Sequence, residues 1–200
     1  FEVRDLAGRV LSDTPRLDVL INNAGIYRTP DPVLPSGQDV RFVVNTLAPY
    51  LLTRLLNTHL NPGGRVVNLS SAAQASVDLQ ALAGDHALEP MAAYAQSKLA
   101  LTMWSMELGL SEASPLQIAV NPGSLLATKM VKEGFGVAGS DIGIGADILI
   151  RAALSDEFAA ASGRYWDNDA KRFADPHPDA LDAETRRAVV KRIQELTGQT

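Results

Sequence analysis

Residues 17–25 read LDVLINNAG, a short apolar segment that stops abruptly at two asparagines, an alanine and a glycine. The run Leu17–Ile21 is apolar except for Asp18 and shows no regular alternation of polar and apolar residues. That pattern is typical of a β-strand buried on both faces of a sheet. Two later segments, residues 65–69 and 116–120, are of the same type and also end in small or polar residues.

Between these strands the sequence has the periodicity of helices. Helices are expected at about residues 3–11, 38–60, 91–110, 140–154 and 179–197, with a short strand at 164–167. This alternation predicts an α/β fold, a doubly wound parallel sheet of the Rossmann type with helices on both faces. No linker or repeat divides the chain, so residues 1–200 are expected to form one domain. In such a sheet ligands bind at the carboxyl ends of the strands.

Composition argues against several classes of function. The chain has 18 basic and 23 acidic residues and a net charge of −5, which argues against binding to nucleic acid or to an anionic membrane surface. The absence of cysteine excludes disulfides and thiolate metal ligands, and a reducing, cytoplasmic location is expected. No apolar run reaches the roughly 18 residues of a membrane span. The histidines at 59, 86 and 177 are too scattered to predict a metal site.

Tyr94 and Lys98 are the pair of residues most suggestive of chemistry. Four positions apart on a predicted helix, they lie on one face, one turn from each other. A tyrosine hydroxyl has a pKa of about 10, and a nearby ammonium stabilises the phenolate. The pair can therefore serve as an acid/base for a carbonyl or alcohol oxygen. The spacing also arises by chance in many helices. Here, however, the surrounding helix is apolar nearly all round, so its lysine needs a partner or a water-filled cleft.

Other polar residues have two interpretations each. Ser70 and Ser71 could hydrogen-bond a substrate oxygen, or they could satisfy backbone donors at the end of a strand. Asn45, a poor helix former within a predicted helix, could be a ligand or an exposed residue. The segment Asn22–Gly25 could contribute to a site or simply form a turn. Residues 167–169, Asp-Asn-Asp, are interpreted as a turn rather than as a calcium site.

Together these motifs resemble the short-chain dehydrogenase/reductase family, and in particular its retinol-dehydrogenase-like branch. The resemblance runs across most of the chain and rests on Asn22-Asn23-Ala24-Gly25, Asn45, Val66-Val67-Asn68-Leu69-Ser70-Ser71, Tyr94 with Lys98, and Pro122-Gly123 with Thr128. Each motif is weak alone, but five in the right order on their expected elements are specific. The resemblance implies an NAD(P)-dependent oxidoreductase that transfers a hydride between nicotinamide and a carbonyl, secondary alcohol or lipophilic alcohol.

The resemblance also implies roles for individual residues. Tyr94 would be the general acid/base, Lys98 would lower its pKa and hold the nicotinamide ribose, Ser71 would orient the substrate oxygen, and Asn45 would anchor a water in a proton relay. The residues implied to bind NAD or NADP are Asn22, Ala24, Gly25, Asn45, Tyr94, Lys98, Pro122, Gly123 and Thr128, without a metal. The alternative is a non-catalytic dinucleotide-binding or scaffold protein of the same fold.

The sequence departs from the family pattern at its beginning. No glycine-rich turn precedes Asn22, so the chain is interpreted as N-terminally truncated, with the first βαβ unit and the choice between NAD and NADP outside it. Residues 75–89 are expected to form a flap over the pocket, and the glycines of residues 130–139 predict a mobile lid. The helices at 38–60 and 91–110 are more apolar than one sheet face requires, which predicts a homo-oligomer.

Overall fold

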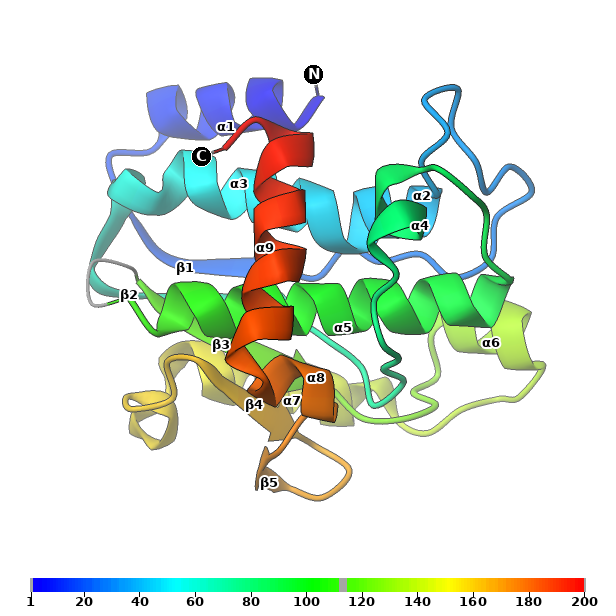
Figure 1. Ribbon diagram of the computed structural model, residues 1–200. Helices are drawn as coiled ribbons and strands as arrows, with labels where there is room; N and C mark the ends of the chain where they lie inside the picture. The colour runs from blue at the N-terminus through cyan, green and yellow to red at the C-terminus, as the bar shows by residue number, and fades with distance from the viewer. Residues whose placement is uncertain (1, 112–114, 200) are drawn as a thin grey trace.

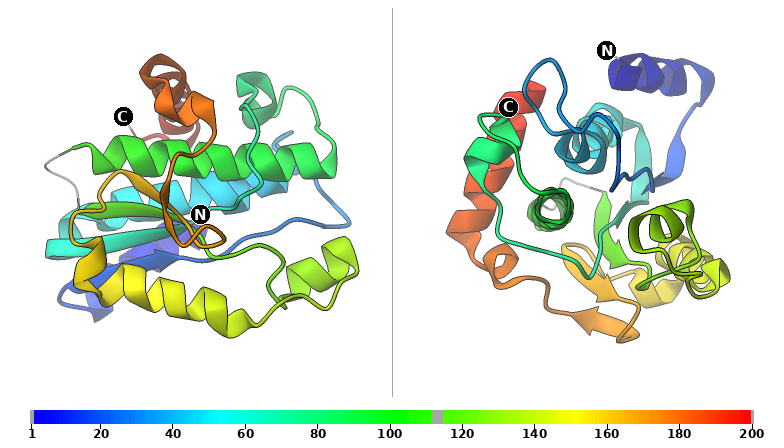
Figure 2. Two further views of the ribbon diagram at one scale, coloured as in Figure 1. Left: turned by 90° about the horizontal axis from the view of Figure 1, so that it is seen from below. Right: turned by 90° about the vertical axis from the view of Figure 1, so that its right-hand side faces the viewer.

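The computed structural model describes residues 2–111 and 115–199, which form a five-stranded sheet with helices on both faces (Figure 1, Figure 2). The strands are β1 (Leu17–Asn22), β2 (Leu60–Leu69), β3 (Leu116–Asn121), β4 (Arg164–Asp167) and β5 (Arg172–Ala174). The α-helices are α1 (Glu2–Asp13), α2 (Val40–Phe42), α3 (Ala48–Leu56), α4 (Leu79–Ala83), α5 (Pro90–Gly109), α6 (Lys129–Phe135), α7 (Ile142–Leu154), α8 (Pro178–Leu181) and α9 (Ala183–Thr197). The predicted α/β fold is confirmed.

The strands lie side by side in chain order, and β1 to β4 are parallel. Their carboxyl ends therefore meet at one edge of the sheet, where the register places Asn22 beside Asn68. The sequence pattern does not predict β5, which runs antiparallel to β4 and pairs Phe173 with Trp166. A strand of three residues is too short to show a periodic pattern. The packing of these two rings, whose centroids are 5.0 Å apart, stabilises it instead.

Helix α5 is the centre of the layer that covers one face of the sheet. Leu99, Met103 and Trp104 are fully buried, because α9 crosses α5 on the side away from the strands (Figure 1). Val189 and Ile193 of α9 belong to the same hydrophobic cluster as these α5 residues. The apolar surplus of α5 is thus covered within one chain and gives no argument for a second subunit, so the homo-oligomer stays a prediction.

The opposite face of the sheet is covered by α7, which lies across the strands from α5 in Figure 2. Ile148 and Ala152 pack against strand residues such as Ile118 in a second hydrophobic cluster. The outer side of the same helix carries Ile150 and Leu154, which are 60% and 72% exposed. The sheet is therefore doubly wound, as the sequence predicts, but α7 keeps apolar side chains on the surface.

The helix expected at residues 38–60 is interrupted. It starts as α2, where the Asp39 carboxylate accepts a hydrogen bond from the Arg41 amide at 2.8 Å and caps the helix. A π-helical turn, Val43–Leu47, follows and contains Asn45, and α3 continues from it. Turns of this kind are rare and occur mainly at functional sites. The expected helical stretch is therefore present from Val40 to His59, while its π-helical turn is a feature that apolar periodicity does not reveal.

Two segments expected to move over the pocket contain short helices. Within residues 75–89, α4 places Ala81 and Leu82 in the hydrophobic cluster around α5. This part of the chain belongs to the core, so the predicted flap is wrong there. Within residues 130–139, α6 ends at Gly136, whose φ of 68° is the left-handed conformation that terminates many helices. That glycine ends a helix, and mobility of the segment stays a prediction.

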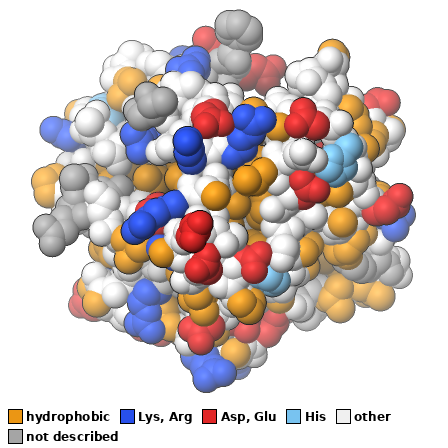
Figure 3. Space-filling view, in the orientation of Figure 1, with side chains coloured by type: hydrophobic (Ala, Val, Ile, Leu, Met, Phe, Trp, Pro, Cys, Tyr) orange, Lys and Arg blue, Asp and Glu red, His pale blue; other side chains and the backbone are white. Residues whose placement is uncertain are grey.

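Charged residues on the face that carries α9 are of both signs and interspersed (Figure 3). Arg186 differs from the charged residues on this surface, because it is only 6% exposed. It donates to the Glu107 carboxylate at 2.7 Å and to the Ala180 carbonyl at 2.9 Å. This arginine therefore fastens α9 to α5 and α8, in addition to the apolar contact between α9 and α5.

The packing of α9 on α5 can be tested by truncating Ile193, which is fully buried in their shared cluster. We expect Ile193→Ala to lower the free energy of unfolding by about 2–5 kcal/mol, because it leaves a cavity in the core. The matched control is Ile150→Ala on the exposed side of α7, for which a change within about 0.5 kcal/mol is expected. Urea denaturation followed by circular dichroism measures both, and equal losses would contradict this packing.

Candidate active site

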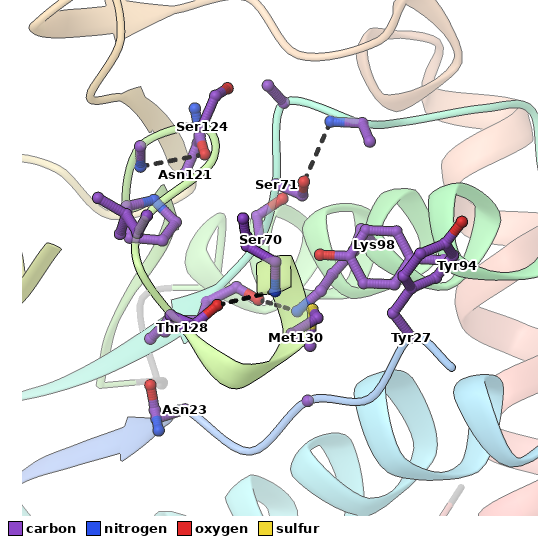
Figure 4. Close-up of a pocket in the computed structure, with 18 of the residues that line it drawn as sticks. Asn23, Tyr27, Ser70, Ser71, Tyr94, Lys98, Asn121, Ser124, Thr128 and Met130 are labelled. Atoms are coloured by element: carbon purple, nitrogen blue, oxygen red, sulfur yellow. Dashed lines mark hydrogen bonds between the residues drawn. The ribbon is translucent and has the colours of Figure 1, made fainter. Parts of the chain in front are cut away.

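A cavity of about 980 Å³ opens at the carboxyl ends of β1, β2 and β3, where the fold predicts a ligand (Figure 4). Its lining consists of Asn23, Ala24, Gly25, Ile26, Tyr27, Val44, Leu69, Ser70, Ser71, Ala72, Ala73, Tyr94, Lys98, Asn121, Pro122, Gly123, Ser124, Leu125, Leu126, Thr128, Met130 and Val131. Most of the residues predicted from the sequence thus lie around one cavity. Asn22 and Asn45 do not line it.

Tyr94 reaches from α5 into the cavity (Figure 4). Its ring meets that of Tyr27 edge-on, with the centroids 5.3 Å apart. Burial raises the pKa of Tyr94, a hydrogen bond with Ser71 lowers it in part, and the net shift is upward from the ordinary value. The hydroxyl is therefore protonated at neutral pH, which is the state required of a proton donor.

Lys98 lies one turn further along α5, and its side chain is 4% exposed. The ammonium donates to the carbonyl of Leu69, at the end of β2, over 2.7 Å. Burial lowers the pKa of Lys98 to about 8, because the charged form loses its hydration. Its Nζ lies 5.8 Å from the centre of the Tyr94 ring. Burial, Ser71 and Tyr27 account for the shift in the pKa of Tyr94, so its lowering by this ammonium stays a prediction.

The two serines after β2 have different surroundings. The hydroxyl of Ser70 shares a 2.6 Å hydrogen bond with that of Thr102 on α5, and Ser70 is only 3% exposed. Ser71 is half-buried, and its hydroxyl accepts from the Ala73 amide at 3.1 Å and interacts with Tyr94. Its backbone is held by Tyr165, whose hydroxyl donates to the Ser71 carbonyl at 3.2 Å. Ser71 is thus the serine placed beside the phenol.

Asn45 is fully buried, so the interpretation as an exposed residue is wrong. Its side-chain oxygen accepts from the Ile26 amide at 2.8 Å, and its amide donates to the Ile26 carbonyl at 2.9 Å and to the Ser97 hydroxyl at 2.9 Å. The π-helical turn presents this side chain to the segment that follows β1. Asn45 therefore fastens the cavity wall to α5, and its predicted water relay stays untested.

Asn22 faces away from the cavity. Its side-chain amide donates to Asn68 at 2.7 Å and to the Thr53 hydroxyl at 3.0 Å, inside the protein between β1, β2 and α3. The implied contact of Asn22 with the cofactor is therefore not supported, because both donors of the amide are used in the core. The next residue, Asn23, is exposed and lines the cavity in its place.

The loop after β3 forms the wall opposite Tyr94. Pro122, Gly123 and Thr128 line the cavity as predicted. Gly123 has a φ of 122°, which side-chain-bearing residues rarely adopt. The Thr128 hydroxyl accepts from the Val131 amide at 3.2 Å and caps α6, so it positions that helix in addition to facing the cavity.

Sequence reasoning missed the apolar part of the lining. Tyr27, Leu126, Met130 and Val131 line the cavity. Tyr27 is only 7% exposed, although it follows a polar motif in a loop. The signal that could identify it is its position, since loops at the carboxyl ends of strands form the sites of such sheets. Met130 and Val131 lie at the start of residues 130–139, the segment predicted as a lid, but the sequence does not single them out because helix α6 has little periodic pattern.

No group of three or more histidine, cysteine, aspartate or glutamate side chains in residues 2–111 and 115–199 is arranged to hold a metal ion. Among the helices that the structure describes, none combines the length and apolarity needed to cross a membrane. Asp169 bonds to the amide and hydroxyl of Ser124, so residues 167–169 form a bonded turn.

The sequence matches the model of a known protein family over the part of the chain that forms most of the site. The family model described as short chain dehydrogenase matches residues 2–136, which include Tyr94, Lys98 and the strand ends around the cavity. The chain therefore belongs to the short-chain dehydrogenase family. The family and the location of the cavity agree, although neither assigns a role to a particular side chain.

Individual relatives resemble the chain over nearly its whole length. Retinol dehydrogenase 13 of Homo sapiens is 30% identical over 219 aligned residues, which cover 98% of this chain and 65% of that protein. This chain thus spans just under two thirds of the human relative. An uncharacterised protein of Mycobacterium paratuberculosis has a solved structure that is 27% identical, with a TM-score of 0.75 over 98% of this chain and 71% of that one. A Shigella flexneri short-chain dehydrogenase, solved with NADP, is 24% identical with a TM-score of 0.62 over 84% and 69% of the two chains.

The burial of Lys98 predicts a dependence of stability on pH. At pH 7 the folded and unfolded states both carry the proton, and folding buries the charge. Above pH 8 the folded state loses that proton before the unfolded state, whose lysine keeps its ordinary pKa of 10.5. The free energy of unfolding should therefore rise by about 2 kcal/mol between pH 7 and pH 9.5.

Replacement of the ammonium isolates this effect. In Lys98→Met we expect the rise between pH 7 and pH 9.5 to be lost, and the variant to be at least as stable as the original protein at pH 7. Urea denaturation at the two pH values measures both quantities. An identical pH dependence in the two proteins would show that Lys98 is hydrated in solution.

Proposed function

We propose that the chain is the catalytic part of an NAD(P)-dependent oxidoreductase that acts on the carbonyl or hydroxyl group of a lipophilic alcohol or ketone. The observation that carries this proposal is the convergence of Tyr94, Ser71 and Lys98 on one cavity at the carboxyl edge of the sheet. The human relative is a retinol dehydrogenase, and the Shigella relative was solved with NADP, and both names support the same class of reaction.

In this proposal Tyr94 holds and moves the proton. In the direction of reduction its hydroxyl donates to the substrate oxygen, and in oxidation the phenolate takes the proton from the alcohol. The raised pKa of Tyr94 keeps the donor protonated at neutral pH. Ser71 lies within hydrogen-bonding reach of the phenol and would hold the same substrate oxygen.

Lys98 would serve both the phenol and the cofactor. An ammonium has three donors, and Leu69 accepts one of them among the residues that the structure describes. The other two are available to ribose hydroxyls. Hydrogen bonds that the ammonium donates to such a ligand would favour the charged form of the lysine, which would then stabilise the Tyr94 phenolate. Asn45 would hold the backbone at Ile26 in place, and its water relay remains part of the proposal.

The residues present fit the nicotinamide half of a dinucleotide. A Cβ atom on Gly25 would lie 3.5 Å from Lys98 Nζ and 3.6 Å from the Asn45 side-chain oxygen, so the glycine leaves open the space between these polar groups. Ala24 and Gly25 would back the adenine side of the cofactor, whereas Pro122, Gly123 and Thr128 would line its nicotinamide end and Lys98 would bind the nicotinamide ribose. When bound, the cofactor supplies or accepts the hydride, which no side chain can do.

The apolar wall of the cavity supports a lipophilic substrate. Four apolar or aromatic side chains face the same space as Tyr94, namely Tyr27, Leu126, Met130 and Val131. Contact with such side chains favours ligands with hydrocarbon portions.

A cytoplasmic location and a homo-oligomer also remain proposals. The first is consistent with the absence of cysteine. The second would use exposed side chains such as Ile150 and Leu154 on α7.

The acid/base assignment predicts the effect of removing one oxygen atom. We expect Tyr94→Phe to lower kcat at least about 100-fold with little change in binding, because the ring stays and only the proton donor is lost. The control is Tyr50→Phe, which removes a phenol of α3 outside the cavity lining. Both are assayed on a panel of ketones and alcohols with NADH and NADPH, using the chain with any residues that its gene encodes before Phe1.

Two outcomes would contradict this assignment in different ways. Full activity of Tyr94→Phe would place the acid/base elsewhere. Binding of NADPH without turnover of any panel member by the unaltered protein would favour the alternative, a non-catalytic dinucleotide-binding protein.

The apolar wall predicts a preference for long substrates. Along a series of secondary alcohols, kcat/KM should rise about fourfold with each added methylene until the cavity is filled, because burial of one methylene contributes about 0.8 kcal/mol. In Met130→Asn the slope of this series should decrease, whereas in Ile150→Asn on the outside of α7 it should not. A flat series in the unaltered protein would exclude a lipophilic substrate.

A further inference from the structure

The loop that follows β3 has an unusual backbone conformation. Gly123 has a φ of 122°, and Leu125 has a φ of 50° although it is not a glycine. A bulky residue in the left-handed region is disfavoured by about 1–2 kcal/mol and persists where its surroundings hold it. Residues 122–126 all line the cavity. The conformation of this strained segment, called here the cavity loop (residues 122–126), therefore decides the shape of the site.

The turn between β4 and β5 supplies the groups that hold the cavity loop. The Asp169 carboxylate accepts from the Ser124 amide at 2.9 Å, from the Ser124 hydroxyl at 2.6 Å and from the Asn121 side chain at 2.9 Å. Asn168 donates to the Pro122 carbonyl at 3.0 Å. The hydrogen bonds from Ser124 and Asn121 outweigh the effect of burial and hold the pKa of Asp169 below its ordinary value. Asp169 is thus charged and bonded at neutral pH.

The cavity loop is also the start of the segment that carries α6. The Ala127 amide donates to the Ser140 carbonyl at 2.7 Å, and the Ser140 amide donates to the Leu125 carbonyl at 2.8 Å. These two bonds join the beginning and the end of the segment that contains α6. The positions of α6 and of its cavity-lining Met130 are therefore linked to that of the cavity loop. A group that fixes Ser124 next to these bonds therefore also fixes the position of α6 over the cavity.

We propose that Asp169 is a positioning residue, which holds the cavity loop and α6 in the conformation that receives the cofactor and substrate. It does not line the cavity itself, so it acts through Ser124. Hydrogen bonds to a charged acceptor contribute more than neutral ones, and three of them converge on this carboxylate. The consequence for turnover rests on the proposed function, whereas the effect on the loop does not.

The first experiment measures the loop without any ligand. Amide hydrogen exchange of the cavity loop, whose amide protons belong to residues 123–126, should accelerate at least tenfold in Asp169→Ala, with little change in β2 and α5. Ser124→Ala should produce a smaller acceleration because it keeps the bonded amide, and Ser124→Thr should behave like the unaltered protein because it keeps the hydroxyl. Asp175→Asn, which alters an exposed carboxylate just after β5, is the matched control.

The second experiment measures the consequence for the site. In a NADPH fluorescence titration and in steady-state kinetics, Asp169→Ala should raise Kd and KM at least fivefold. The value of kcat should stay within twofold and the shape of its pH profile should not change, because both report on Tyr94. The double variant Asp169→Ala, Ser124→Ala should be no worse than Asp169→Ala alone, because both changes remove the same interaction.

Three results would overturn the proposal. Unchanged exchange in residues 123–126 would show that the loop holds its conformation without Asp169. Faster exchange throughout the protein with a lower Tm would show a general structural role. Faster exchange confined to the loop with unaltered Kd and KM would show that its position does not affect binding. If the unaltered protein neither binds NADPH nor turns over substrate, the proposed function fails, and the exchange experiment alone decides whether Asp169 holds the loop.

Discussion

The burial of the Lys98 ammonium is the constraint on which the arrangement of the site depends. Burying an isolated charge is strongly unfavourable, and the protein limits that penalty with the Leu69 carbonyl at the end of β2. This bond requires α5 to pass directly over the carboxyl edge of the sheet. With one side against the strands, α5 is buried on its other side by α9, through residues such as Ile193. The C-terminal helix thus supports the site although it supplies no residue to the cavity.

A buried polar network across the strand ends separates structural asparagines from the cavity. Asn22 donates to Asn68 on the neighbouring strand at 2.7 Å, and Asn68 donates in turn to Ser105 on α5 at 2.9 Å. Buried amides of this kind need every donor paired, so their side chains cannot also face a ligand. Residues further along the chain from these two asparagines, such as Asn23 after β1 and Ser71 after β2, line the cavity instead.

The sequence predicts the parallel sheet and the polar part of the cavity lining, because apolar strands and their polar ends are local patterns. It predicts Tyr94, Lys98 and Ser71 as neighbours because topology brings the strand ends together. It does not predict the π-helical turn around Asn45, the pairing of Phe173 with Trp166 in β5, or the burial of Tyr27. Each of these depends on contacts between residues far apart in the chain. The same holds for Asp169, which resembles an ordinary turn residue until Ser124 is placed beside it.

The pKa values of Tyr94 and Lys98 differ from those that the Tyr-x-x-x-Lys spacing alone suggests. An isolated ammonium beside a phenol lowers the pKa of the phenol and favours the charged form of both. Inside the protein, burial instead raises the pKa of Tyr94 and lowers that of Lys98 to about 8, so burial favours the neutral form of each. Only a ligand that accepts hydrogen bonds from Lys98 reverses this balance, because it stabilises the ammonium inside the protein. The acid/base strength proposed for Tyr94 therefore depends on the bound ligand as well as on the Tyr-x-x-x-Lys spacing.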